Sequence, residues 1–293
     1  MTEYIGIDLG GTSVRAGGMD ETGAVFFQKK VPTYENVTTG EDLIRKLDGL
    51  IRAVPSWEQA KAVGVGVPGA VDLATNRVTV ADNLTLLNGL PLAQELEKSL
   101  GKPVLLENDA RVAALAEAVS GAGRGRHTVC YMTISTGLGG AVVQGGTIYH
   151  GSSNMGSYLC RMILDGEQNC ENLLSGTALR RRLSEKLGRP VDSAGEVFGL
   201  EAAGDPAAKE IAEAFRRNLA VLFMNLAVTF NPDIIVAGGG VMQAADRFWE
   251  DAVARFRSKA HPQLRDTAFA RAVHSEPGLL GACLLAKSSR KDL

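Results

Sequence analysis

The chain has 293 residues, 45% of them hydrophobic and 22% charged, with a formal net charge of −2 at pH 7. That composition is ordinary for a soluble globular protein, and the length allows two domains with separate cores. The charge argues against a nucleic-acid-binding surface, and no apolar run approaches the roughly 18 residues that a membrane span needs. We therefore expect neither nucleic acid nor membrane as a partner.

The amino terminus, MTEYIGIDLG, has the pattern of a strand rather than of a signal peptide. The four cysteines are scattered and show no C-x-x-C spacing, so we expect reduced and mostly buried thiols in a cytoplasmic protein. They are Cys130, Cys160, Cys170 and Cys283.

Apolar runs and glycine-rich turns alternate along the first part of the chain. The apolar patterns predict three strands, a helix and two short buried strands, in that order. Asp109 is then expected to open a helix that reaches residue 120 and to act as its N-cap. The predicted segments before it are residues 4–9, 13–19, 24–31, 41–53, 62–67 and 104–107.

The second part of the chain repeats this theme, again beginning with a hairpin over a glycine-rich turn. Two such halves indicate duplicated α/β domains with a cleft between them. We place the domains at residues 1–115 and 116–293, with the last helix as a candidate to cross back to the first domain. Strands are predicted at residues 129–134, 140–149, 233–237 and 268–273, and helices at residues 171–187, 206–229, 247–259 and 278–287.

Two of the glycine turns occupy matching positions in the two halves and pair glycine with threonine. Glycine lets backbone N–H groups approach anionic oxygens, and the threonine hydroxyl adds a further donor. Neither turn is a Walker A loop or opens a helix, and a plain hairpin turn is the alternative for each. The repetition favours phosphate binding, and Asp8 before the first turn is expected to hold Mg²⁺ through water. The turn residues are Gly10, Gly11, Thr12, Thr136 and Gly137.

Two further glycine clusters have different explanations. Gly238 and Gly239 follow a buried strand, where bare backbone suits a flat adenine ring; a simple strand-to-helix turn is the alternative. Residues 64–69 match G-x-G-x-x-G, but Pro68 and the strand-like run after it do not present a helix N-terminus, so dinucleotide binding is disfavoured.

The pair Asn108–Asp109 stands at a strand-to-helix junction and is the predicted chemical centre. A hydroxyl that attacks a phosphoryl group benefits from a carboxylate that orients it and accepts its proton. A structural N-cap is the alternative for Asp109, and both roles are compatible. His150 lies nearest the expected cleft, but surface or packing roles are favoured for all four histidines.

These motifs, in their order and spacing, resemble the ROK family of sugar kinases within the actin-like ATPase superfamily. The resemblance runs nearly end to end. It implies two RNase H-like domains with a central cleft, and MgATP-dependent phosphorylation of a hexose or hexose derivative at a primary hydroxyl. It also implies a homodimer. The motifs are DLGGT, GVPGAVD, ENDA, ISTGLGG, SGTAL, NPDIIVAGGG and the helix that contains Gly281 and Ala282.

The resemblance also assigns roles by position. Asp109 is expected to be the general base and Asn108 to bind sugar hydroxyls, with Gly69 and Asn83 in loops that line the sugar pocket. The nucleotide phosphates are expected at Gly10, Gly11, Thr12, Thr136 and Gly137, and the adenosine at Gly238 and Gly239.

One segment departs from the family pattern. Where members commonly carry A-G-E-x-G-H, this chain has Tyr158 in place of the glutamate and Arg161 in place of the histidine. The usual zinc loop keeps only Cys170, so no zinc is expected. Glu171 remains where a last sugar-contacting glutamate is expected. We therefore expect an altered sugar pocket.

Two alternatives without kinase activity remain open. A family repressor carries an N-terminal helix-turn-helix, for which the strand predicted from Tyr4 leaves no room. A sugar-sensing pseudokinase is suggested by the lost glutamate and histidine, whereas the retained Asn108–Asp109 pair and both phosphate turns argue for a kinase.

Overall fold

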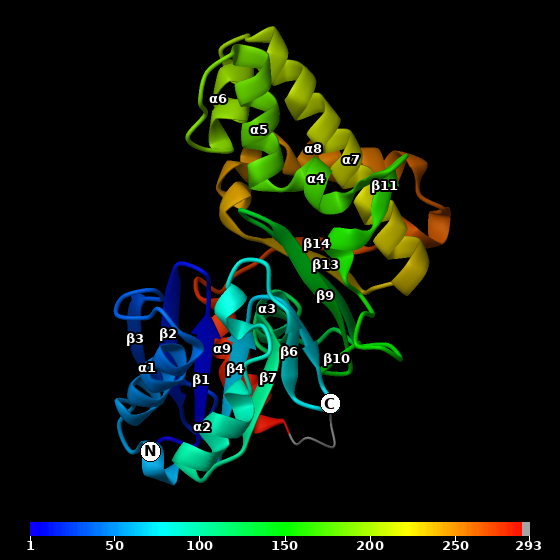
Figure 1. Ribbon diagram of the computed structural model, residues 1–293. Helices are drawn as coiled ribbons and strands as arrows, with labels where there is room; N and C mark the ends of the chain where they lie inside the picture. Colours follow the sequence, from blue (N-terminus) through cyan, green and yellow to red (C-terminus); the bar gives the residue numbers. More distant parts are fainter. Residues whose placement is uncertain (289–293) are drawn as a thin grey trace. The chain divides into compact units, whose positions relative to one another are not determined.

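The computed structural model describes residues 1–288, and these residues group into two compact units (Figure 1). Unit 1 comprises Met1–Val119, Thr147–Gly156 and the segment that begins at His274. Unit 2 comprises Ser120–Gly146 and Ser157–Val273. The sequence led us to expect a single boundary near residue 115. In the structure the chain crosses between the two units four times, because an internal segment and the last helix return to unit 1.

Unit 1 is built on a five-stranded sheet in the order β3-β2-β1-β4-β7. The first three strands form an antiparallel meander, and β4 and β7 continue the sheet in parallel with β1. A small hairpin of β5 and β6 follows β4. The bounds are β1 Tyr4–Leu9, β2 Ser13–Met19, β3 Val25–Pro32, β4 Ala62–Val67, β5 Ala70–Asp72, β6 Arg77–Val80 and β7 Val104–Asn108.

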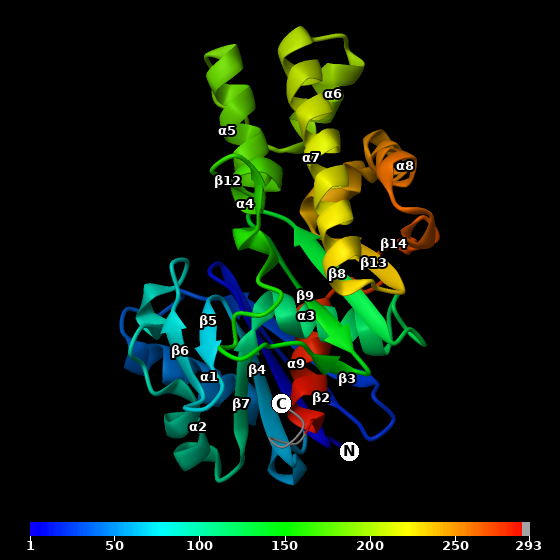
Figure 2. The ribbon, with the colours of Figure 1, turned by 90° about the vertical axis from the view of Figure 1, so that its right-hand side faces the viewer.

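Helices cover both faces of this sheet: α1 and α2 lie on one face and α9 on the other, with α3 packed against α9 (Figures 1 and 2). Glycines in the strands allow α9 to approach closely. A Cβ on Gly64 would lie only 2.0 Å from the carbonyl oxygen of Ala282, so a side chain there would push the helix off the sheet. The bounds are α1 Gly40–Arg52, α2 Leu92–Leu100, α3 Asp109–Val119 and α9 Pro277–Lys287, with 3₁₀ turns at Trp57–Gln59 and Thr85–Leu87.

The second sheet repeats the same strand order, β10-β9-β8-β13-β14. Strands β8 and β9 are antiparallel, and β13 and β14 continue in parallel with β8. Its bounds are β8 Thr128–Ile134, β9 Leu138–Gln144, β10 Thr147–Ile148, β13 Ile234–Gly238 and β14 Ala268–Arg271. The repeated order confirms the expected duplication of α/β domains.

The helices of unit 2 pack around a large apolar core that contains a cluster of aromatic rings. The long helix α7 crosses the unit, and α5 and α6 lie beside it (Figure 2). The bounds are α4 Cys170–Leu174, α5 Gly176–Leu187, α6 Gly195–Ala202, α7 Pro206–Phe230 and α8 Trp249–Lys259, with the hairpin β11 Ile163–Asp165 and β12 Gln168–Asn169 and 3₁₀ turns at Leu159–Arg161, Gly240–Arg247 and Pro262–Leu264.

Two predicted elements are divided in the structure. The helix expected at residues 171–187 breaks at Ser175, whose extended backbone ends α4 and whose hydroxyl caps α5 by accepting from the N–H of Ala178. The strand expected at residues 140–149 starts earlier, at Leu138, and is interrupted by Gly145 and Gly146, which both have positive φ. The expectation did not include α2, α6 or the two small hairpins.

A search of residues 1–288 finds no helix with the length and apolarity needed to cross a membrane.

Candidate functional site

The parallel strands of unit 1 end at the same edge of the sheet and bring three predicted site residues to it. Asp8 lies one residue before the end of β1, Asn108 ends β7, and Gly69 follows β4. Ligands of open α/β sheets bind outside the carboxyl ends of the parallel strands. This edge is therefore the candidate site of unit 1.

Asn108 is almost completely buried, and every hydrogen-bonding position of its side chain is engaged. Its Nδ2 donates to the carbonyl oxygen of Gly69 and to Oδ1 of Asp109, both at 3.0 Å. Its Oδ1 accepts from the backbone N–H groups of Ala110 and Arg111 at 3.0 and 3.2 Å. The N-cap of α3 is thus Asn108 and not Asp109, because its side chain satisfies the first helical donors.

Asp109 occupies the first position of α3, half-buried. Its Oδ1 accepts from the N–H of Ala110 at 2.7 Å as well as from Asn108. The pKa of the Asp109 carboxyl is raised to about 6: burial and, to a smaller extent, the nearby Asp8 raise it, and those two hydrogen bonds lower it. The result is a carboxylate that is ionised at neutral pH yet basic enough to accept a proton.

Asp8 is held by a residue that the sequence reasoning missed. Arg15 stands opposite it in the β1–β2 register, with Nη1 at 3.2 Å from Oδ2 of Asp8, and its Nε lies 2.9 Å from Oε2 of Glu276. Burial raises the pKa of Asp8, and Arg15 opposes this. A Cβ on Gly278 would lie 2.8 Å from the Asp8 carboxyl, so the first turn of α9 packs directly on it. The hairpin register was the signal that could have identified Arg15.

The first glycine turn is tightly built. The N–H of Gly10 donates to the carbonyl oxygen of Ser13 at 3.0 Å, and Thr12 is exposed. A Cβ on Gly11 would lie 3.1 Å from the carbonyl oxygen of Asn83, so the structure brings this turn against the exposed Asn83. Both belong to unit 1.

Gly69 has a φ of +122°, which L side chains rarely adopt. A Cβ there would lie only 2.2 Å from the carbonyl oxygen of Val80. Glycine is therefore required for the loop that gives Asn108 its carbonyl partner.

The second glycine turn, in unit 2, is fastened to the start of α5. The N–H groups of Gly176 and Thr177 donate to the carbonyl oxygens of Ser135 and Thr136 at 2.7 and 3.1 Å. Glu171 lies directly on this turn: its Oε1 accepts from the N–H of Leu138 at 3.4 Å. A Cβ on Gly137 would lie 2.6 Å from the same oxygen.

Gly238 ends β13 and Gly239 follows it, both close to β8. Gly239 has a φ of +92°, and a Cβ there would lie 2.4 Å from the carbonyl oxygen of Ile134. A Cβ on Gly238 would lie 2.9 Å from the hydroxyl of Tyr131. Larger residues are thus excluded at Gly239 by the backbone of β8 and at Gly238 by the side chains of Tyr131 and Ala272.

The segment that departs from the family pattern lies in unit 2. Tyr158 is half-buried and packs on the apolar core, whereas Arg161 is exposed. Cys160 and Cys170 are buried free thiols, and residues 1–288 hold no cluster of three or more metal-ligating side chains.

The structure also joins residues that the sequence left apart. His150, expected at the surface or in packing, is buried with its Nε2 at 2.5 Å from Oε2 of Glu107, one residue before Asn108. Arg111 completes this cluster, with Nη1 at 3.5 Å from Oε1 of Glu107. The i,i+4 spacing of Glu107 and Arg111 could have indicated their ion pair, whereas nothing in the sequence indicates that His150 contacts Glu107.

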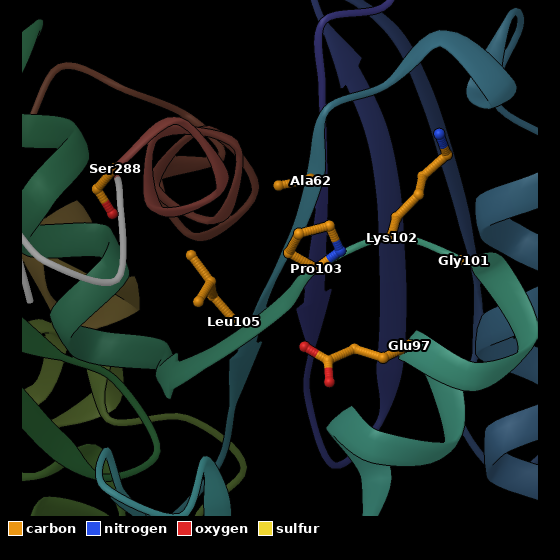
Figure 3. A pocket seen from close by; sticks show the side chains of 7 residues that line it. All are labelled: Ala62, Glu97, Gly101, Lys102, Pro103, Leu105 and Ser288. Atoms are coloured by element: carbon orange, nitrogen blue, oxygen red, sulfur yellow. The ribbon is translucent and has the colours of Figure 1, made fainter.

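A cavity of about 590 Å³ lies at the other edge of the first sheet, where β4 and β7 begin (Figure 3). The candidate site lies at the carboxyl ends of these strands, where ligands of such sheets bind, whereas the cavity lies at their amino ends. The cavity is therefore separate from the candidate site. Its lining consists of Ala62, Glu97, Gly101, Lys102, Pro103, Leu105 and Ser288.

Comparison with known proteins gives consistent results. Residues 4–289 match the model of the ROK family. The glucokinase of Thermotoga maritima is 34% identical over 267 residues, covering 83% of this chain and 84% of its own length. A ROK hexokinase structure from Thermus thermophilus has a TM-score of 0.87 at 33% identity, with 98% of both chains covered. The structure of a ROK family glucokinase from Streptomyces griseus in complex with glucose and AMPPNP has a TM-score of 0.78 at 27% identity, covering 98% of this chain and 99% of its own.

Proposed function

The chain belongs to the ROK family and is an ATP-dependent sugar kinase with the two-domain actin-like ATPase fold, and we propose that Asp109 is its general base. One observation carries this assignment. The Asp109 carboxylate stands at the carboxyl edge of the parallel strands, half-buried and fastened by Asn108, with its pKa raised to about 6. A base of that strength is ionised at neutral pH and still accepts a proton from an attacking hydroxyl.

In the proposed mechanism the protein contributes position and charge. When bound, MgATP would supply the phosphoryl group, and its Mg²⁺ would neutralise the charge that develops on it. Asp109 orients the primary hydroxyl of a hexose or hexose derivative and accepts its proton as the hydroxyl oxygen attacks. The hydrogen bonds from Asn108 and Ala110 to one Asp109 oxygen keep the carboxylate from rotating, which preserves the attack geometry.

We assign the nucleotide to the glycine-built turns of both units. Glycine leaves the backbone N–H groups of such turns bare, and bare N–H groups can approach phosphate oxygens or a flat base, which supports the assignment. Asp8 offers the carboxylate oxygen that Mg²⁺ prefers, acting through water beside Arg15. The proposed phosphate residues are Gly10, Gly11, Thr12, Thr136 and Gly137, and the proposed adenosine residues are Gly238 and Gly239.

We assign the sugar to Asn108, Gly69 and Asn83 from unit 1, and to Glu171, Tyr158 and Arg161 from unit 2. Every hydrogen-bonding position of the Asn108 side chain is engaged, so a sugar hydroxyl would have to replace one of its present partners. Replacing the carbonyl oxygen of Gly69 would keep the hydrogen bond that holds Asp109. The exposed Arg161 donates only, which supports an altered sugar preference relative to a glutamate-lined pocket.

Three further features extend the proposal. We infer that the enzyme works without zinc, since the residues around Cys170 lack the usual ligands.

We infer a homodimer, supported by the apolar side chains of Val221 and Val228. They lie exposed seven residues apart on α7, and so on one face of that helix. A cytoplasmic location is supported by the use of ATP and by the four free, buried thiols.

The test is ADP formation by the purified protein with MgATP over a panel of hexoses, glycosides and N-acetylated hexosamines, run beside Asp109→Asn. A phosphorylated sugar from the wild type and a loss of about 100-fold or more in kcat from the variant are expected for a missing general base. Sugar binding without turnover by the wild type would instead establish the pseudokinase alternative. Near-normal turnover by Asp109→Asn would leave the kinase standing and refute its proposed base.

A further inference from the structure

The carboxylate of Glu107 is completely buried at the end of β7. Nε2 of His150 lies 2.5 Å from Oε2, and Nη1 of Arg111 lies 3.5 Å from Oε1. A buried carboxylate without partners costs several kcal/mol, so these donors hold the group in one place. An ionised carboxylate only accepts hydrogen bonds, so His150 can serve it only as a donor through Nε2–H.

A chain of short hydrogen bonds connects this carboxylate to the proposed base. Oε1 of Glu107 accepts from the backbone N–H of Asn108 at 2.7 Å. The side chain of Asn108 caps α3 and donates to Oδ1 of Asp109 at 3.0 Å. The orientation of Asp109 therefore depends on the backbone at Asn108, and that backbone is held by Glu107.

One of these donors, Arg111, also holds a second segment. Nη2 of Arg111 donates to the carbonyl oxygens of Asn154 and Gly156 at 2.6 and 3.0 Å, and the N–H of Gly156 donates to the carbonyl oxygen of His150 at 2.7 Å. The turn at residues 150–156 is thus fastened to β7 and α3 within unit 1. Its chain continues directly into Tyr158, in the segment assigned to the sugar.

We propose that Glu107 and His150 are positioning residues for phosphoryl transfer, and that their buried pair holds Asp109 in its reactive orientation. This inference rests on the proposed role of Asp109 and adds residues that touch neither substrate. His150 acts through Glu107 and Asn108, and Arg111 keeps both the carboxylate and the turn at residues 150–156 in register. Even a small displacement of a general base from its position beside the attacking hydroxyl lowers the rate by a large factor.

The experiment compares His150→Ala, His150→Gln and Glu107→Gln with Glu117→Gln as a matched control. Glu117 is also completely buried and lies on α3, eight residues beyond Asp109. Its Oε1 accepts a hydrogen bond from the N–H of His274 at 2.8 Å. Each variant is measured for kcat, for KM of sugar and ATP, for the pH dependence of kcat, and for thermal stability.

His150→Ala is expected to lower kcat about 10- to 100-fold with a smaller change in either KM. The midpoint of its acidic limb is expected to move, because Asp109 would sit differently relative to Asp8, Asn108 and the N–H of Ala110. His150→Gln restores a donor to Glu107 and is expected to recover most of kcat. Glu117→Gln is expected to lose thermal stability while keeping kcat and the acidic limb.

Wild-type kcat and an unmoved acidic limb in His150→Ala would overturn the inference, as would an equal loss of kcat in Glu117→Gln. If His150→Ala does not fold, Glu107→Gln decides in its place, since it keeps the shape of the side chain but removes the charge that attracts His150 and Arg111. Asp109→Asn separates the two proposals. If it stays active, the base assignment fails and positioning fails with it, whereas an inactive Asp109→Asn beside a normal His150→Ala removes positioning alone.

Discussion

The side chains of Asn108 and Asp109, neighbours in sequence, are hydrogen-bonded to each other at 3.0 Å, with the amide Nδ2 of Asn108 as donor and Oδ1 of Asp109 as acceptor. The same amide group caps α3 through its oxygen, so the start of the helix and the orientation of the carboxylate are set by one side chain. This coupling between local structure and chemistry makes separate predictions for rate and for stability.

The first prediction concerns the pH dependence of turnover. A general base works only when deprotonated, so kcat should rise with pH through about 6, the raised pKa of Asp109, and level off above it. The measurement is kcat under saturating MgATP and sugar between pH 5 and 8. An acidic limb centred near 4 would mean that the carboxylate is solvated and not buried as the structure has it.

The second prediction concerns stability, and its sign follows from the same shift. The unfolded chain loses this proton near pH 3.8 and the folded chain only near 6, so ionising Asp109 weakens the folded state as pH rises between the two. Asp109→Asn removes the charge and should raise the free energy of unfolding at pH 7.5 by about 1 to 3 kcal/mol. Urea unfolding of both proteins should show this gap shrinking toward pH 4, and a variant that is less stable at pH 7.5 would contradict it.

A third prediction separates the two roles of Asn108. Asn108→Ala removes the cap of α3 and the partner of Gly69, which should cost about 1 to 2 kcal/mol of stability along with activity. Asn108→Asp keeps an oxygen for the cap and should lose less stability. It also places a second carboxylate beside Asp109, which should move the acidic limb of kcat upward by about one unit or more. Melting curves and pH–rate profiles of the two variants test this, and identical behaviour would argue against a distinct capping role.

The fourth prediction is that the purified enzyme carries no stoichiometric zinc. A structural zinc site needs four ligands, and here the loop offers Cys170 while Arg161 brings a cation to the position of a histidine ligand. Metal analysis should find far less than one zinc per chain, and activity should require Mg²⁺ and survive brief chelation of zinc. One tightly bound zinc per chain would show that other residues supply the ligands.

The fifth prediction is that free glucose is not the best substrate. An arginine only donates hydrogen bonds and a tyrosine adds an apolar face, so the pocket should favour a glycoside oxygen, a carbonyl or an acetamido group over a free hydroxyl near the anomeric end. The comparison is kcat/KM for glucose, mannose, fructose, a β-glucoside and N-acetylated hexosamines. A clear lead for glucose would mean that Tyr158, which packs on the core, and the exposed Arg161 do not select the sugar.

The class of fold and the chemistry could be predicted from the amino-acid sequence alone. The glycine turns and the Asn108–Asp109 pair are local patterns whose meaning comes from backbone freedom and side-chain type, and their order along the chain identified the family. The pairing of Asp8 with Arg15 could also be predicted from the sequence, because the length of the turn fixes the antiparallel register of β1 and β2.

The distant groups that surround the base could not be predicted in this way, because tertiary packing brings them together. His150 and Glu107 are 43 residues apart in the chain, and no periodicity or spacing links them until the turn at residues 150–156 packs against α3. The raised pKa of Asp109, which begins α3, likewise depends on burial and on Asp8 from β1. Burial and contacts between distant segments arise from packing the whole unit, which is why local patterns predict the elements of the site but not their electrostatic environment.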